Sequence, residues 1–315
     1  MAKNKIQFQK GYSIVDLFRD YGKEKQCEDA LFKWRWPEKL CCSKCGSDSY
    51  YSLKTRRLYQ CNHCHHPTSL TAGTIFEKTK LPLTTWFLGI HLLTQSKTGL
   101  SALELKRQLG VSYNTAWLMK HKVMQVMKER DDSKPLKGLV QLDDVYWGGE
   151  RHGGKRGRGS ADKTPFVAAV EVSEDGHPLK MNMTVVKGFR KTAISQWANR
   201  HLSAGSLVVS DGLSCFSAVK EAGCVPHSIV TGGGVACITL TEFTWVNTMI
   251  GNMKNAMNGT YHSIHHQHLP RYLAEFCYRF NRHFQLDDML PRFMSVALRT
   301  SPMPGKMLSM ADPYG

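Results

Sequence analysis

The pattern of apolar and polar positions changes near residue 135 of this 315-residue chain. Before that point, apolar residues recur every three or four positions, as they do on one face of a helix. This spacing predicts helices within 12–35 and after Pro82, the latter with Thr84 or Thr85 near its cap. After that point, short apolar runs alternate with amphipathic stretches. We therefore expect a helical part followed by a part that mixes strands and helices.

The order of elements in the second part predicts its fold. Strands are expected at 138–146, 165–172, 179–187, 206–210 and 227–231, and helices at 191–202, 213–222, 244–257 and 268–282. Three strands before any helix make an antiparallel meander, and the alternation that follows adds parallel neighbours. This order is that of the ribonuclease-H-like (RNase H-like) fold. The expected fold class is α/β, with a mixed five-stranded sheet flanked by helices.

The amino-acid composition indicates that the protein binds a polyanion. The chain has 42 Lys and Arg against 26 Asp and Glu, a formal charge of +16. This excess favours nucleic acid as a partner, and binding should weaken steeply with salt because phosphate contacts release counterions. No apolar run reaches the roughly 18 residues of a membrane span. The first residues also lack the apolar stretch of a secretory signal. We expect a cytoplasmic, nucleoid-associated protein with no membrane partner.

Four of the ten cysteines have the spacing of a metal site. They are Cys42, Cys45, Cys61 and Cys64. Two residues intervene within each pair, and fifteen separate the pairs. The stretches 50–53 and 57–60 between them have the pattern of a two-stranded hairpin. Four thiolates around one ion fit tetrahedral zinc, so the sequence predicts a zinc ribbon whose metal is structural and not catalytic.

The stretch 100–122 has the pattern of a helix-turn-helix. Ser101 with Glu104 three residues later predicts a capped helix, Gly110 ends it, and Ser112 caps the next helix. The second helix would present four side chains to DNA. They are Tyr113, Asn114, Lys120 and Lys122. Plain packing of a helical hairpin is the alternative, but the neighbouring ribbon and the positive charge favour DNA contact.

These motifs and a charged linker at 128–135, which ends in a proline, suggest the domain organisation. The predicted segments are N-terminal helices (1–38), a zinc ribbon (39–75), a helical DNA-binding region with the helix-turn-helix (80–130), an RNase H-like domain (136–300) and a tail (301–315).

Two aspartates stand where predicted strands end. Asp143 and Asp211 each follow a short apolar run. Asn247 and Lys254 lie two helical turns apart, so both side chains leave the same face of their predicted helix. Oxygen ligands gathered from separate strands and one helix are what Mg²⁺ needs to bind a phosphodiester. The set indicates phosphoryl transfer on DNA, with capped turns or surface carboxylates as the alternative explanation.

Several stretches around these residues match a known family. They are 141–149 (QLDDVYWGG), 209–212 (VSDG), 245–248 (WVNT), Lys254, 259–262 (GTYH) and 271–282 (RYLAEFCYRFNR). From the zinc ribbon to the last helix, the chain resembles bacterial insertion-sequence transposases with a zinc-ribbon head and an integrase-like, DDE-type catalytic domain.

The resemblance assigns roles to the site residues. It implies that Asp143 is the first metal ligand and Asp211 the second. Asp144 is the rival for the first position, because strand alternation should let only one of the two neighbours face the site. Many members have Glu seven residues before the helix lysine. Asn247 holds that place here, and it supplies an oxygen without a negative charge.

The resemblance also implies the reaction and its partners. The transposase would bind the terminal inverted repeats of its element and catalyse strand cleavage and strand transfer into target DNA. Two Mg²⁺ (or Mn²⁺) ions at Asp143, Asp211 and Asn247 would serve both steps. Lys254 would hold a phosphate near the scissile bond. Since two DNA ends must be held together, we expect at least a homodimer on double-stranded DNA.

A basic, glycine-rich segment between the first two strands offers further phosphate contacts. Its glycines remove bulk, so that cationic side chains can follow a DNA backbone. The candidates are Arg151, Lys155, Arg156 and Arg158. A solvated hairpin tip is the alternative explanation.

Two other functions fit the same residues. A non-catalytic DNA-binding regulator or domesticated remnant is one, and Asn247 is its best support. A nuclease of the same fold, which cuts but never joins, is the other. The transposase is preferred because the ribbon and helix-turn-helix provide end recognition that a simple nuclease does not need.

Overall fold

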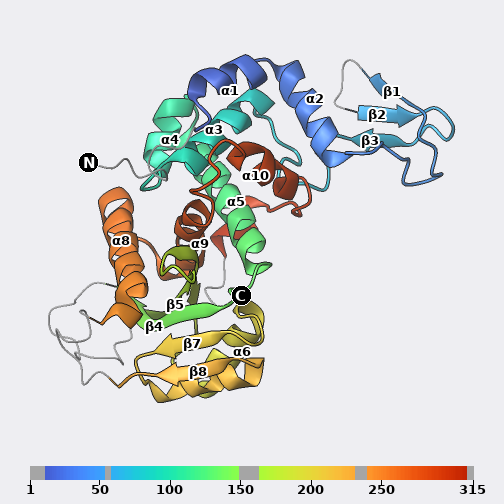
Figure 1. Ribbon diagram of the computed structural model, residues 1–315. Helices are drawn as coiled ribbons and strands as arrows, with labels where there is room; N and C mark the ends of the chain where they lie inside the picture. Colours follow the sequence, from blue (N-terminus) through green and yellow to red (C-terminus); the bar gives the residue numbers. More distant parts are fainter. Residues whose placement is uncertain (1–10, 54–57, 149–162, 231–239, 311–315) are drawn as a thin grey trace. The chain divides into compact units, whose positions relative to one another are not determined.

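The computed structural model describes residues 11–53, 58–148, 163–230 and 240–310 (Figure 1). The contacts divide the chain into two units. The helical unit comprises Met1–Ser96, Leu100–Val126 and Phe284–Ser309, and the sheet unit comprises Lys97–Gly99, Met127–His283 and Met310–Gly315. Phe284–Ser309 thus groups with the helical unit, whereas the predicted boundaries place 284–300 in the RNase H-like domain and 301–309 in the tail. Among the described residues, no helix combines the length and the apolarity that crossing a bilayer requires.

The helical unit begins with α1 (Ile14–Tyr21) and α2 (Glu24–Arg35), and continues with α3 (Leu83–Gln95). The carboxylate of Glu24 accepts hydrogen bonds from the backbone N–H groups of Leu83 and Thr84, at 2.9 and 3.2 Å. The acceptor that caps α3 therefore comes from another helix, while Thr84 lies in the first turn, near the N-cap Pro82, as predicted. Near the end of the chain, α10 (Met289–Ala297) packs against α2 and α3, and α11 (Gly305–Ser309) follows.

The ribbon is a three-stranded antiparallel sheet in the order β1-β2-β3. Its strands are β1 (Tyr50–Leu53), β2 (Leu58–Cys61) and β3 (Pro67–Ser69). The first two form the predicted hairpin, with Tyr50 opposite Cys61. The third strand has only three residues and was not predicted.

The predicted helix-turn-helix is formed by α4 (Ala102–Leu109) and α5 (Tyr113–Asp132). The Ser101 hydroxyl accepts a hydrogen bond from the Glu104 N–H at 3.1 Å. Gly110 ends α4 with a φ of +65°, a conformation that glycine adopts without steric cost. The Ser112 hydroxyl accepts from the Thr115 N–H at 3.2 Å. The local signals for starting and ending both helices therefore act as the sequence predicts.

The sheet unit is a mixed α/β structure with a five-stranded sheet, as predicted. The strands are β4 (Leu139–Trp147), β5 (Thr164–Val172), β6 (Pro178–Val185), β7 (Leu207–Ser210) and β8 (Val225–Ser228). Their order is β6-β5-β4-β7-β8. The β4, β5 and β6 strands pair antiparallel, whereas β7 is parallel to both β4 and β8. The meander with parallel additions places β4 at the centre of the sheet.

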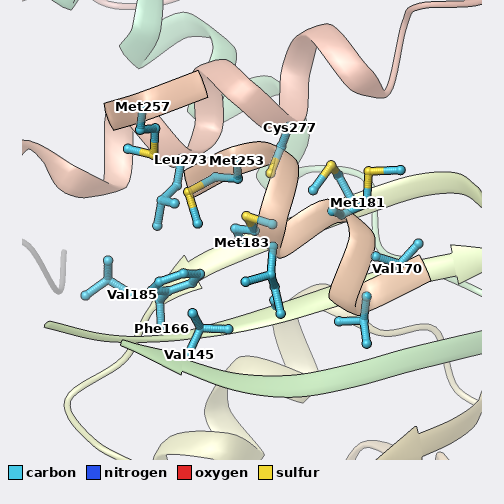
Figure 2. Packing of buried hydrophobic residues seen from close by; sticks show 14 of the residues in the cluster. Val145, Phe166, Val170, Met181, Met183, Val185, Met253, Met257, Leu273 and Cys277 are labelled. Atoms are coloured by element: carbon cyan, nitrogen blue, oxygen red, sulfur yellow. The ribbon is translucent and has the colours of Figure 1, made fainter. Parts of the chain in front are cut away.

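Helices cover both faces of this sheet. They are α6 (Lys191–His201), the 3₁₀ helices η1 (Ser214–Ala222), η2 (Thr241–Phe243) and η3 (His266–His268), and the α-helices α8 (Thr244–Tyr261) and α9 (Leu269–Phe280). Leu142 joins the core that α6 and η1 cover. Val145 joins the core under α8 and α9, where Figure 2 shows it with Phe166, Met183 and Met253. Odd-numbered residues of β4 thus face α8, and even-numbered ones face α6.

The end of α9 is bonded to the free edge of the sheet. The Asn281 side-chain oxygen accepts from the Met181 N–H at 2.8 Å, and its amide nitrogen donates to the Met181 carbonyl at 3.0 Å. The same amide also donates to Asp131 at 3.0 Å, and Arg282 pairs with Asp131 at 2.7 Å. The Arg282 guanidinium lies 3.6 Å from the ring centre of Tyr278. The polar residues of the 271–282 motif are therefore structural where these contacts are made.

Candidate metal centres

Three carboxylates converge beside the middle of β4, where the neighbouring strand β7 ends. Leu142 of β4 lies opposite Ser210 of β7 in the parallel register, and the next residue of each segment is an aspartate. One oxygen each of Asp143, Asp144 and Asp211 lies within 4.8 Å of the others. The expectation that only one of the two neighbours could face the site is therefore wrong. The pairing of β4 with β7 stops at Leu142 and Ser210, so the three aspartates lie just beyond the last paired residues on that side of β4.

The electrostatics of the cluster fit a bound cation. The pKa of Asp143 is raised to about 7, first by burial and then by the negative charges of Asp144 and Asp211. The Asp144 N–H, 2.8 Å from Asp143 Oδ1, and the Lys254 ammonium offset part of this effect. Repulsion among carboxylates is what a divalent cation relieves, and oxygen ligands suit Mg²⁺ or Mn²⁺. The donor set therefore fits such an ion.

A glycine turn fixes the second aspartate. The Asp211 carboxylate accepts a hydrogen bond from the Leu213 N–H at 3.1 Å. Between them Gly212 has a φ of +86°, and a Cβ there would lie 3.1 Å from Ser228 Oγ and 3.3 Å from Val230 Cγ2. Only glycine fits both the conformation and the space without adjustment. The Asp-Gly turn thus holds Asp211 at the end of β7.

The α8 helix carries the remaining candidate residues. It begins at Thr244, so that Asn247 lies in its first turn and is half-buried, whereas Lys254 is exposed two turns later. Since Lys254 lowers the pKa of Asp143, its charge is felt at the acidic cluster. Asn247 shares that face of the helix by its spacing of seven residues. The structure thus brings Asp143 and Asp211 together and lets the Lys254 charge act on Asp143, while Asn247 is placed only by its position in α8.

Gln141 contacts this helix and was missed by the sequence analysis. Its side chain is 4% exposed, and its Oε1 accepts hydrogen bonds from the N–H groups of Trp245 and Val246, both at 3.0 Å. Nothing in the spacing of the sequence pairs a strand glutamine with a helix start more than 100 residues away. The only available signal was a polar residue inside an apolar strand.

The four predicted zinc ligands come together in the ribbon. Their sulfur atoms all lie within 4.8 Å of one another, with 3.5 Å between Cys42 and Cys64 and between Cys45 and Cys61. Gly46, at a φ of +75°, donates its N–H to the Cys42 carbonyl and closes the first knuckle. The backbone N–H groups of the second knuckle, first that of Cys64, lower the pKa of Cys61 to about 6. A cluster of thiolates with this spacing fits structural zinc.

The predicted DNA-contact residues divide into two groups. Tyr113 is 49% exposed and Asn114 is also exposed, at the start of α5. Lys120 and Lys122 are buried and donate to the carbonyls of Leu100 and Ile75, at 2.9 and 2.7 Å. Their prediction as DNA contacts is wrong, because an ammonium held inside the helical unit cannot reach a phosphate.

Further cationic residues lie elsewhere. Lys106 and Arg107 are exposed in the last turn of α4, and the sequence analysis did not select them. The signal for their exposure was the pattern of polar residues around them, with Glu104 before and Gln108 after them in α4. Arg151, Lys155, Arg156 and Arg158 lie outside the described residues.

Two descriptions of known families match the chain. A transposase zinc-ribbon domain matches residues 22–67, and an ISXO2-like transposase domain matches residues 135–281. Both matched descriptions are of transposase domains. The chain is also similar to an uncharacterized protein in transposable element ISH50 of Halobacterium salinarum, with 27% identity. The alignment covers 49% of this chain and 57% of that relative. The host of this relative is archaeal, so the similarity extends beyond the bacterial members that the sequence resembles.

Proposed function

We propose that this protein is a transposase that binds the terminal inverted repeats of its own insertion sequence and catalyses metal-dependent cleavage and joining of DNA strands. The observation that carries the proposal is the convergence of Asp143 and Asp144, in the middle of β4, with Asp211 at the end of β7, within a domain that matches transposases. Carboxylates from separate strands suit phosphoryl transfer, in which catalysis consists of positioning and charge stabilisation.

Each residue of the centre has a proposed task. Asp143, Asp211 and Asn247 would hold divalent ions, Mg²⁺ or Mn²⁺, which when bound activate water and stabilise the charge that develops on the phosphate. Asp144 adds the third carboxylate of the cluster. It thereby supplies the negative charge that an asparagine lacks at position 247. Lys254, exposed on the same helix face, would hold a phosphate of the DNA as a point charge.

The two steps exchange phosphorus–oxygen bonds. A water oxygen attacks the phosphorus at the element end, the bond from phosphorus to the 3′ oxygen breaks, and a 3′ hydroxyl is left on the element. That hydroxyl then attacks a phosphodiester of the target DNA. A new bond to phosphorus forms, and the 3′ oxygen of the target strand leaves. Since one phosphodiester replaces another, joining needs no added energy source.

Recognition of the element ends is assigned to the helical unit. Tyr113 and Asn114 at the start of α5 would contact base edges, as recognition helices do with their first residues. Lys106 and Arg107 would contact the phosphates beside them. The zinc ribbon and the basic segment 151–159 would add further phosphate contacts. Two copies of the chain would hold the two ends of the element.

Strand transfer with pre-cut ends tests the proposal. The substrate is a duplex carrying the inverted repeats that flank the gene, with a plasmid as target and Mg²⁺ or Mn²⁺ added. We expect the wild type to join strands, and Asp143→Ala to lose joining while it still shifts the duplex in a gel. Asp175→Ala, which removes an exposed acid in the turn between β5 and β6, is the matched control.

The outcomes distinguish the alternatives. Cleavage of uncut ends without joining of pre-cut ends would favour a nuclease. End binding with no metal-dependent cleavage would favour a non-catalytic regulator. Joining by Asp143→Ala would show that the assignment of the site is wrong.

A further inference from the structure

Gln141 is a buried polar side chain beside the acidic cluster. It lies on β4 two residues before Asp143, on the same face of the strand, so that the two Cα atoms are about 7 Å apart. Gln141 is 4% exposed, and both hydrogen bonds that Oε1 accepts come from the first turn of α8. The strand that carries the first aspartate is thus bonded directly to the helix that carries Asn247.

These bonds take the place of an ordinary helix cap. The first N–H groups of a helix have no partner within it, and a side chain just before the helix usually accepts them. The residue at that position is Phe243, and no cap hydrogen bond is made there. Phe243 and Val246 are buried, so the neighbouring N–H groups would lack an acceptor if Gln141 were apolar. The position of the first turn of α8 relative to β4 therefore depends on the side-chain oxygen of Gln141.

A second contact fixes the same turn. The Trp245 indole N–H donates to the Gly176 carbonyl, in the turn between β5 and β6, at 2.6 Å. Val246 packs with its side chain in the core under α8. The residue that follows is Asn247. Its backbone is thereby held from the strand below and from the neighbouring hairpin.

We infer that Gln141 is a positioning residue of the metal centre: it fixes the first turn of α8, and with it Asn247, opposite Asp143. The inference rests on the proposed function, because Asn247 is a ligand only if the centre binds metal. Asn247 brings no charge that would draw it to a cation. Its position must then be set by the backbone that carries it, and that backbone is bonded to Gln141.

Variants of Gln141 separate this role from a general loss of stability. Gln141→Leu keeps the approximate volume and removes the acceptor. Gln141→Glu keeps an acceptor oxygen at the position of Oε1 and replaces the amide nitrogen with a second oxygen, and its charge suits the positive end of a helix. Met257→Ala is the matched control, since it opens a cavity under the same helix more than three turns away without touching the cap.

The first readout is the binding of Mn²⁺ without DNA. It is measured by electron paramagnetic resonance, from the decrease of the signal of free Mn²⁺. Loss of residues that orient a metal ligand weakens metal affinity by about 10–100-fold. We expect a loss in this range for Gln141→Leu, and wild-type affinity or better for Gln141→Glu. Met257→Ala should bind Mn²⁺ like the wild type even if it melts earlier. The half-saturating Mn²⁺ concentration for strand joining should follow the same order.

A double-mutant comparison tests the route of the effect. If Gln141 acts through Asn247, Gln141→Leu should change Mn²⁺ affinity by less than about twofold in an Asn247→Ala background. If the two substitutions instead act independently, so that their fold-losses of Mn²⁺ affinity multiply in the double variant, the inference is overturned. It is also overturned if Gln141→Leu binds Mn²⁺ like the wild type, or if Met257→Ala loses as much affinity. If Gln141→Leu does not fold, Gln141→Asn, which withdraws the acceptor by one methylene, is measured in its place with the same expectation.

The two proposals fail in different ways. A wild type that neither binds Mn²⁺ nor joins strands would refute the proposed function. A wild type that does both, with Gln141→Leu unchanged, would refute only the positioning role.

Discussion

Asp143→Asn should make this protein more stable at pH 8 when Mg²⁺ and Mn²⁺ are absent. The wild-type carboxylate is held near two other carboxylates in a half-buried place. The amide has almost the same shape and no charge, so it removes the repulsion. The residue proposed as the first metal ligand is therefore expected to weaken the metal-free fold.

The magnitude follows from the pKa of Asp143. Burial and the neighbouring charges raise it from 3.8 to about 7 in the folded state. The folded state therefore keeps a proton that the unfolded chain releases, and stability falls as the pH rises from about 4 to 7. Above that window the ionised carboxyl costs the fold at most about 4 kcal/mol, at 1.36 kcal/mol for each pKa unit. A domain of this size melts about 2–4 °C higher for each kcal/mol gained.

Thermal unfolding followed by circular dichroism measures the effect. The protein keeps its zinc and is dialysed against buffers without Mg²⁺ or Mn²⁺, because a strong chelator would also remove the zinc. Asp143→Asn should melt several degrees above the wild type at pH 8, and the difference should shrink towards pH 4.5. Added Mn²⁺ should stabilise the wild type and leave the variant unchanged.

Asp175→Asn serves as the control for a lost surface charge, and it should melt like the wild type. The reasoning is refuted if Asp143→Asn melts at or below the wild-type temperature at pH 8 without divalent ions. It is also refuted if the difference is the same at pH 4.5, because repulsion should vanish once Asp143 is protonated.

Three further predictions concern other parts of the chain. Cys61→Ser should lose the bound zinc, measured by atomic absorption, and should bind element ends more weakly in gel shifts. The double substitution Lys106→Ala and Arg107→Ala should reduce the slope of log DNA affinity against log salt concentration by about 0.9 for each lost phosphate contact. By contrast, Lys120→Met should lower the thermal stability and leave that slope unchanged. Gly212→Ala should lower the free energy of unfolding in urea by about 1–3 kcal/mol, because an alanine is strained at this φ; a loss below 0.5 kcal/mol would contradict this.

The sheet could be predicted because its signals are local. Alternation along β4 places Leu142 and Val145 on opposite faces, and the element order gives the topology. Two details could not be predicted in the same way. The strand β3, only Pro67–Ser69, is too short to show alternation. The segment Ser214–Ala222 is a 3₁₀ helix, and nine residues do not distinguish a period of 3.0 from one of 3.6.

The site was predictable where its chemistry follows from spacing along the chain. The cysteine pairs are of this kind, as are the two aspartates that each follow an apolar run, Asp143 within β4 and Asp211 after β7. Gln141 was not predictable, because its partners lie 104 and 105 residues away and only the tertiary fold brings them together. The burial of Lys120 could have been predicted, although the sequence analysis assigned this residue to DNA contact. It lies four residues after Ala116 and three before Val123, both buried, so the helical period places it on the inner face of α5.

The bond between Asn281 and Met181 has a consequence for how the molecule avoids its own copies. The strand β6 is the outermost of its sheet, and an outermost strand exposes N–H and C=O groups that can pair with another chain. At Met181 both groups are already taken by one side-chain amide. The β6 strand of a second copy would find no free N–H or C=O group at Met181. Edge-to-edge pairing of two sheets, which leads to aggregation, is therefore hindered at that position.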